Sequence, residues 1–195
     1  METPDEIIRN YTTADAETRV DIVCRYFPQI DGIITCGINN ICYIICESRE
    51  QSRQYDSTEL GVRVQTSGGL SNPTARDGEF EVNVEKAVRT CNFAGGVLDD
   101  VDDSDLIIME ANALRDMKRV QKLILGQLSA MEPEDRALFQ RYLNHETSMT
   151  NLADELGINY MSAAKRMNRL RKTIKVDVVA VIRFTSKNRG RKEAV

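Results

Sequence analysis

The sequence predicts an all-α protein with an N-terminal helical region, a long central helix and a C-terminal three-helix domain that contains a helix-turn-helix. Three observations predict this fold class. Apolar residues recur at helical spacing along most of the chain, one such stripe continues over seven positions within residues 106–131, and a glycine turn separates two amphipathic stretches within residues 149–172. With 42% hydrophobic and 29% charged residues among 195, the chain has the composition of a soluble globular protein.

Composition divides the chain into five segments. Glycine, proline, serine, threonine and asparagine concentrate in residues 55–80, as is typical of a linker, and the chain ends in the basic stretch KNRGRKEAV. We therefore expect a helical N-terminal region at 1–54, a flexible linker at 55–80, a helical region with a long connecting helix at 81–131, a helix-turn-helix domain at 132–184 and a basic, disordered tail at 185–195.

The N-terminal region is expected to be helical. In residues 14–26 the apolar side chains of Val20, Ile22, Val23 and Tyr26 share roughly one side, and Pro28 ends the helix. Residues 30–52 are dense in isoleucine, which fits one buried helix or two short strands. Their length and their polar ending, ESREQSRQ, favour the helix. A further helix is expected at 80–94, around Val82, Val84, Ala87 and Val88.

A long helix is expected from Leu106 to Met131, spanning about 39 Å at 1.5 Å per residue. Its predicted apolar stripe is Leu106, Met109, Ala113, Met117, Val120, Ile124 and Leu128, and the methionines, Met131 included, are interpreted as core filler. The helix packs either on the N-terminal helices or on a second copy of itself. Five aspartates in residues 99–105 precede it. Ser104 stands where a calcium loop needs glycine, so we interpret them as a solvated acidic helix N-terminus.

The sequence offers no pattern for a metal site or a cofactor. The five cysteines, Cys24, Cys36, Cys42, Cys46 and Cys91, contain no CxxC pair, and we expect reduced core cysteines. No apolar run approaches the roughly 18 residues of a membrane span, and the acidic N-terminus lacks the pattern of a secretory signal. A cytoplasmic protein that does not bind membranes is therefore expected.

Charge is distributed unevenly along the chain. Residues 160–195 carry eleven Lys or Arg against two acids, a net +9, whereas residues 1–159 carry fifteen basic and twenty-eight acidic residues, a net −13. The two sums give the overall charge of −4. A basic end of this kind indicates a polyanionic partner, and a merely solvated basic tail is the alternative.

Residues 133–172 have the layout of three short helices. Pro133 suits the first position of a helix, NHET at 144–147 forms a loop that exposes His145, and Gly157 suits a turn that needs a left-handed backbone. Ile158 is expected to fill the angle between the last two helices, and Asn159 to cap the second. The expected buried positions are Leu152, Ala153, Leu156, Ala163, Met167 and Leu170.

The second helix of this layout is basic on its exposed side. We expect Lys165, Arg166, Arg169, Arg171 and Lys172 to point outward along it. A recognition helix enters the major groove of DNA with its first residues at base edges and its cations near phosphates. The pattern therefore predicts double-stranded DNA as the partner, and a helical hairpin with a solvated basic face is the alternative.

The segment LFQRYLNHETSMTNLADELGINYMSAAKRMNRLRKTI resembles the DNA-binding region four of bacterial sigma factors, through RYL, the short loop, LADELGI and the basic helix. With the linker GVRVQTSGGLSNPTA and the long helix, the chain also resembles ArpU-type phage transcriptional regulators. The first resemblance covers about 45 residues and the second about 130. Residues 1–100 contain no match to the promoter-opening region of a sigma factor. A sigma-like regulator of phage or mobile-element genes is therefore expected.

By the resemblance, the base-reading positions are Tyr160, Met161, Ala164 and Lys165, of which only Lys165 is a usual base-edge donor. It likewise implies phosphate contacts from Ser162, Arg166, Arg169, Arg171 and Lys172, and Asn159 and Asn168 complete the expected DNA-binding set. RNA polymerase and a second copy of the chain are the further partners considered.

The sequence also bears on two other classes of function. A protein-docking module would use the surface around Met161 and Ala164, and the scarcity of base-reading donors favours it, whereas the +9 end opposes it. An enzyme is not expected, because the sequence has one His, no Ser/His/Asp set and no Gly-Lys-Ser/Thr ending to its glycine-rich loop.

Overall fold

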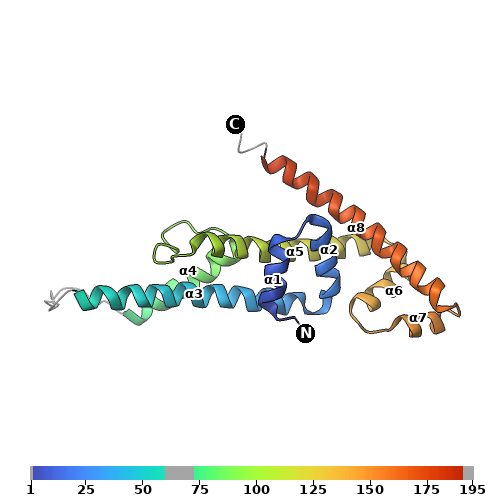
Figure 1. Ribbon diagram of the computed structural model, residues 1–195, viewed down its shortest axis with the longest axis horizontal. Coiled ribbons are helices and arrows are strands. Elements are labelled where there is room, and N and C mark those ends of the chain that lie inside the picture. The colour runs from blue at the N-terminus through green and yellow to red at the C-terminus, as the bar shows by residue number, and fades with distance from the viewer. Residues whose placement is uncertain (1, 60–72, 191–195) are drawn as a thin grey trace. The chain divides into compact units, whose positions relative to one another are not determined.

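The computed structural model describes the backbone of residues 2–59 and 73–190, and the side chains of residues 2–53 and 77–185. Within these ranges the chain is all α, without a strand (Figure 1). The α-helices are α1 (Pro4–Thr13), α2 (Ala16–Arg25), α3 (Ile30–Glu59), α4 (Pro73–Thr90), α5 (Ser104–Ala130), α6 (Pro133–Leu143), α7 (Met149–Glu155) and α8 (Tyr160–Gly190), with a short 3₁₀ helix at Phe27–Gln29.

The helices form two compact units. The first comprises Met1–Ile33 and Asp116–Val195, and the second comprises Ile34–Arg115. These boundaries differ from those expected at residues 54, 80 and 131. The physical reason is that α3 and α5 are long enough to contribute one part to each unit, so that each unit joins segments that are distant in sequence.

The first unit begins with a helix that is capped at its start. The Thr3 hydroxyl accepts a hydrogen bond from the backbone N–H of Glu6, and the Glu6 carboxylate accepts one from the N–H of Thr3. This reciprocal capping satisfies two N–H groups that a helix start leaves without partners. On its inner side, α1 buries Ile7, Ile8 and Tyr11.

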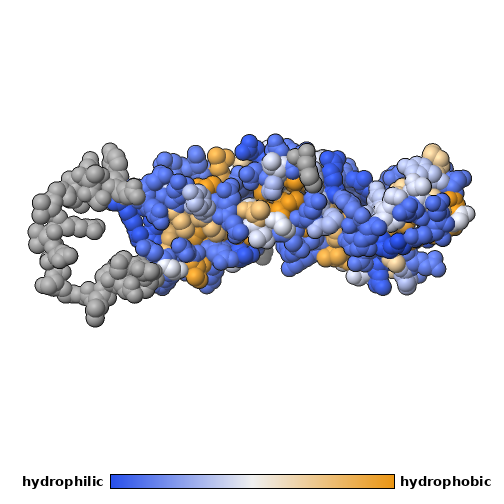
Figure 2. Space-filling view, turned by 90° about the horizontal axis from the view of Figure 1, so that it is seen from below, coloured by the Kyte–Doolittle hydropathy of each residue, from blue (hydrophilic) through white to orange (hydrophobic). Residues whose placement is uncertain are grey.

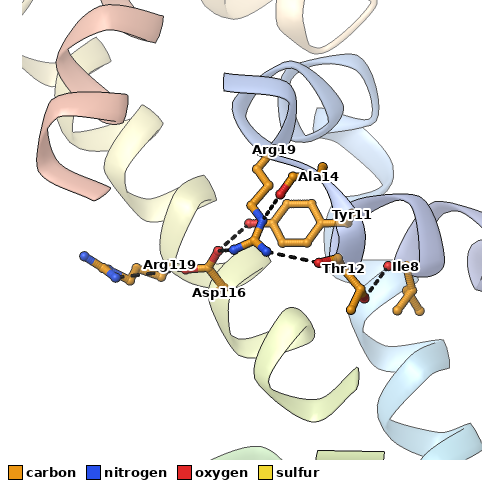
Figure 3. Close-up of polar contacts among 7 residues, drawn as sticks. All are labelled: Ile8, Tyr11, Thr12, Ala14, Arg19, Asp116 and Arg119. Atoms are coloured by element: carbon orange, nitrogen blue, oxygen red, sulfur yellow. Dashed lines mark hydrogen bonds and ion pairs between the residues drawn. The ribbon is translucent and has the colours of Figure 1, made fainter. Parts of the chain in front are cut away.

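A polar network connects the helices of the first unit (Figure 3). Asp116 of α5 accepts hydrogen bonds from the Tyr11 hydroxyl at 2.9 Å and from Nη1 of Arg19 at 3.2 Å. Arg19 also donates to the carbonyl oxygens of Thr12 and Ala14, which lie at the end of α1 and just beyond it. One guanidinium and one carboxylate thereby fix α1, α2 and α5 to one another.

In the second unit, parts of α3, α4 and α5 share an aliphatic core. The buried residues are Ile34, Ile38, Ile41, Ile45, Val84, Ala87, Val88, Ile107, Ala111, Ala113 and Leu114. The isoleucine-rich segment is thus one helix, as predicted, rather than two strands. Towards the far part of α3, the guanidinium carbon of Arg49 lies 3.6 Å from the centre of the Phe80 ring, a cation–π contact.

The buried stripe of α5 differs from the predicted one at its start. Leu106 is 52% exposed and Met109 47% exposed, whereas Ile107 and Ala111 are buried. From Ala113 onward the predicted positions are buried as expected. Apolar residues fill five of the six positions of LIIMEA at 106–111, which allows two stripes at helical spacing, and packing in the second unit selects the one that starts at Ile107.

Helices cover both ends of the range predicted as a linker. Helix α3 continues to Glu59, and α4 begins at Pro73 rather than at residue 80. Proline at a helix start loses no intrahelical hydrogen bond, so Pro73 marks the beginning of α4 instead of a loop. Residues 60–72 of the predicted linker lie outside the described residues. At the other end, α8 includes residues 185–190, which were expected in the tail.

One stretch, Phe27–Arg53, is long and apolar enough to cross a membrane by length and composition, although no such run was expected. Core helices of soluble proteins pass the same test, and 39% of the most apolar window is buried within the structure. The outward side of the helix carries Thr35, Asn39 and Asn40, all exposed.

The cysteines do not share one environment. Cys24 is buried, whereas Cys36 is exposed and the other three are half-buried, so the prediction of core cysteines is wrong for Cys36. The aspartates of residues 99–105 are exposed and lead into α5 at Ser104, as predicted. Among the described residues, no three His, Cys, Asp or Glu side chains gather as metal ligands would.

Candidate nucleic-acid interface

Helix α6 begins with Pro133 at its first turn and buries Phe139 and Leu143. It ends at Leu143, and His145, two residues later, has a left-handed φ of 57°. The N–H of His145 bonds to the carbonyl of Tyr142, and the N–H of Glu146 reaches back to Arg141. This pair of bonds terminates a helix sharply and turns the chain towards α7.

Helix α7 is short and is held at both ends. At its start the Ser148 hydroxyl accepts a hydrogen bond from the N–H of Asn151. At its end Glu155 accepts two hydrogen bonds, of 2.8 and 2.9 Å, from the guanidinium of Arg141 in α6. Those bonds hold the pKa of the Glu155 carboxyl below its usual range. Between the two ends, Leu152 and Ala153 are buried.

The turn between α7 and α8 depends on Gly157, which has a φ of +61°. The N–H of Gly157 bonds to the carbonyl of Asp154, and the N–H of Ile158 bonds to that of Ala153. Such a pair of bonds ends a helix with glycine in the left-handed region, as the sequence predicted. Ile158, however, is 37% exposed and does not fill the angle between the helices, because the turn carries its side chain to the surface.

Asn159 begins α8, and its side-chain oxygen accepts a 2.8 Å hydrogen bond from the N–H of Ser162. Asn159 is therefore the helix cap that the sequence predicts. The inner side of α8 buries Ala163, Met167, Leu170, Ile174, Val178, Val179 and Ile182. These positions continue the predicted buried face by three further turns, along which α8 packs against α2 (Figure 1).

Residues 160–185 of α8 contain seven cations, and ion pairs divide them into two groups. Arg166 pairs with Asp135 of α6, Arg171 and Lys175 pair with Asp21 of α2, and Arg183 pairs with Glu17 of α2. The remaining three, Lys165, Arg169 and Lys172, are exposed and have no acidic partner within the described part of the chain.

The three unpaired cations lie on one face of α8. Their spacing of four and three residues places Lys165, Arg169 and Lys172 one above another. The exposed side chains of Met161, Ser162 and Asn168 lie beside them at the same helical spacing. We call these six residues the open face of α8. Met161, at its first turn, is 73% exposed.

The other predicted site residues lie elsewhere. Tyr160 is 54% exposed at the first position of α8, and Ala164 is half-buried. Arg166 and Arg171 were predicted to point outward, but both side chains are held by acids on other helices. Arg171 lies towards α2, 3.0 Å from Asp21, and Arg166 donates to Asp135 of α6 from both Nε, at 2.9 Å, and Nη2, at 2.5 Å.

The sequence analysis did not predict the acidic residues that form ion pairs with cations of α8. Asp21 is separated from Arg171 by 150 residues and from Lys175 by 154, and Glu17 is separated from Arg183 by 166. No local pattern in the sequence marks such pairs. Only the packing of α2 against α8 brings these groups together.

A hollow of about 450 Å³ lies beside the first turns of α8. It is lined by Ile158, Ser162, Lys165, Arg166 and Arg169. Three cations and a hydroxyl around one open hollow are groups that proteins use to contact phosphate oxygens. On the face shown in Figure 2, polar residues cover much of the surface between separate apolar patches.

Comparison with protein-family models, with curated proteins and with solved structures returned no match. The resemblance to sigma factor region four and to ArpU-type regulators therefore stays a prediction.

Proposed function

We propose that this chain is a DNA-binding transcription regulator, sigma-like and non-enzymatic, that acts in the cytoplasm. In this proposal α7 and α8 are a helix-turn-helix, and α8 is the recognition helix that enters the major groove. The observation that carries the proposal is the open face of α8. Of the seven cations in residues 160–185, the three without an acidic partner in the described ranges lie together on that face.

The roles follow from position along α8. Met161 and Lys165, in the first two turns, are placed as a recognition helix places its base-edge contacts: an ammonium donates to guanine acceptors, and an apolar side chain contacts a thymine methyl. Ser162, Arg169 and Lys172 are the proposed phosphate contacts. Asn159 supports them indirectly, because its side chain is occupied in capping the helix.

The proposal is tested by titrating the full chain against a short random DNA duplex at about 50 and 200 mM salt. Binding is expected to weaken several-fold or more at the higher salt, because each phosphate contact releases counterions. The double variant Lys165→Ala/Arg169→Ala is expected to bind more weakly and to flatten the slope of log affinity against log salt by up to about 1.8.

Lys122→Ala provides the matched control, since it removes an exposed cation from α5 rather than α8. Equal losses in Lys122→Ala and in the double variant would point to general charge attraction and contradict the proposed face. Absence of binding by the wild-type chain at the lower salt would contradict DNA binding itself.

A second candidate function is docking on a protein such as RNA polymerase. The observation that favours it is a group of exposed apolar side chains at the start of α8, namely Ile158, Tyr160 and Met161. Such side chains are typical anchors of protein interfaces. Met161→Lys distinguishes the two functions: it would abolish capture of purified RNA polymerase if the face docks protein, while largely preserving salt-dependent binding to random DNA.

A further inference from the structure

One carboxylate pairs with a cation that lines the hollow beside the start of α8. A single oxygen of Asp135, Oδ1, accepts both hydrogen bonds from Arg166, at 2.9 Å from Nε and 2.5 Å from Nη2. Both side chains remain partly accessible, with 28% of Arg166 and 24% of Asp135 exposed. Arg166 lines the same hollow as Ser162, Lys165 and Arg169.

The pair differs from the other ion pairs of α8. Arg171, Lys175 and Arg183 are paired with α2, along the side on which α8 packs, whereas Arg166 is the paired cation of the hollow. A partly exposed ion pair typically adds little to stability, on the order of 0–1 kcal/mol. Asp135 also lies in the first turn of α6, where a carboxylate favours the positive end of the helix dipole, and its partner Arg166 stands among the cations proposed to meet phosphates.

We propose that Asp135 is an internal competitor of DNA phosphate for Arg166, and that it thereby limits the affinity of the chain for DNA of any sequence. This inference rests on the proposed function. While Asp135 holds Nε and Nη2, the guanidinium cannot present that bidentate edge to a phosphate, although guanidinium binds phosphate best in this manner.

The consequence is a lower affinity for every DNA sequence alike, while the preference among sequences stays the same. Phosphate contacts are the same on every DNA sequence, so removing one weakens specific and non-specific binding equally and does not alter base reading. Lys165 and Met161 still distinguish one base sequence from another, whereas Arg166 binds phosphate only when Asp135 releases it.

The test is the variant Asp135→Asn, which keeps the shape of the side chain and removes its charge. Titrated against the random duplex, it is expected to steepen the salt slope by about 0.9, which corresponds to roughly eightfold tighter binding at about 0.1 M salt. Asp154→Asn is the matched control, because it removes an exposed carboxylate of α7 for which the described residues provide no cationic partner. It is expected to leave the salt slope unchanged.

The double variant Asp135→Asn/Arg166→Ala isolates the pair. In the Arg166→Ala background, Asp135→Asn should change neither slope nor affinity, and thermal unfolding of each variant establishes that it is folded. Weaker binding by Asp135→Asn would overturn the proposal, since Asp135 would then position Arg166 for DNA. An unchanged slope would overturn it too.

The two proposals fail in distinguishable ways. A wild-type chain that binds DNA and loses affinity in Arg169→Ala, but not in response to Asp135→Asn, overturns the role of Asp135 alone. Absence of DNA binding in both the wild type and Asp135→Asn overturns the proposed function together with this inference.

Discussion

The Tyr11 hydroxyl donates a 2.9 Å hydrogen bond to Oδ2 of Asp116, although 105 residues separate the two in sequence. Tyr11 is fully buried, and the same carboxylate oxygen also accepts a hydrogen bond from Arg19. Burial, followed by the negative charge of Asp116, raises the pKa of the Tyr11 phenol well above its usual range. The first helix of the chain is thereby fixed to α5.

Tyr11→Phe is expected to lower the free energy of unfolding by about 1–2 kcal/mol, because a buried hydrogen bond to a carboxylate is lost while the ring packing stays. Urea unfolding of the wild type and the variant measures this change in free energy. Tyr43→Phe is the matched control: this ring is 65% exposed and its hydroxyl has no hydrogen-bond partner among the described residues. We expect a change within about 0.5 kcal/mol there. Equal effects in the two variants would contradict the role of Asp116.

Gly157→Ala is expected to destabilise the chain by about 1 kcal/mol. A methyl group at this position would meet no atom within 4 Å, so the cost comes from the φ of +61° alone. Gly126→Ala provides the opposite case, because Gly126 lies on the exposed side of α5, also with free space around it. Within a helix, alanine should stabilise by about 0.5–1 kcal/mol. Two thermal unfolding curves that shift in the same direction would contradict the turn geometry.

Adjacent residues at the start of α5 are expected to respond very differently. Ile107 is buried, and Ile107→Ala should cost about 2–4 kcal/mol through lost burial and the resulting cavity. The neighbouring Leu106 is 52% exposed, and Leu106→Ala should cost less than about 1 kcal/mol. Chemical denaturation of both variants decides which stripe of α5 faces the core. A larger loss of unfolding free energy in Leu106→Ala than in Ile107→Ala would support the stripe predicted from the sequence instead.

The thiol of Cys24 should make folding stability depend on alkaline pH. Burial raises its pKa to about 11, whereas the thiol of an unfolded chain titrates near 8.5. Because the pKa is raised on folding, the contribution is complete below about pH 8.5 and is lost as pH rises towards 11. Cys24→Ala should therefore lose less stability than the wild type between pH 8 and 10.5. An equal loss of stability with rising pH in the wild type and in Cys24→Ala would contradict the raised pKa of Cys24.

Local signals in the sequence predict the helices and their ends. Pro133 starts α6, Gly157 ends α7 and Asn159 caps α8, each as expected from its backbone preference or its side-chain acceptor. These signals act within a few residues, so they are legible without knowledge of the rest of the chain. The same holds for α3, whose length favours a helix over two strands.

The residues of the candidate site were predicted, but which of its cations form ion pairs was not. Lys165, Arg169 and Lys172 are exposed, as expected, and have no acidic partner among the described residues, whereas Arg166 and Arg171 engage Asp135 and Asp21. Periodicity assigns side chains to a face of one helix, but it contains no information about acids on other helices.

By itself, the sequence determined that this chain is helical, where several of its helices begin, and that its positive charge concentrates on α8. Tertiary structure alone decided which stripe of α5 is buried and which cations of α8 remain open to a partner. The physical reason is range: capping, turn and periodicity preferences act over a few residues, whereas the Asp21–Arg171 pair spans 150 residues and exists only because α2 packs against α8.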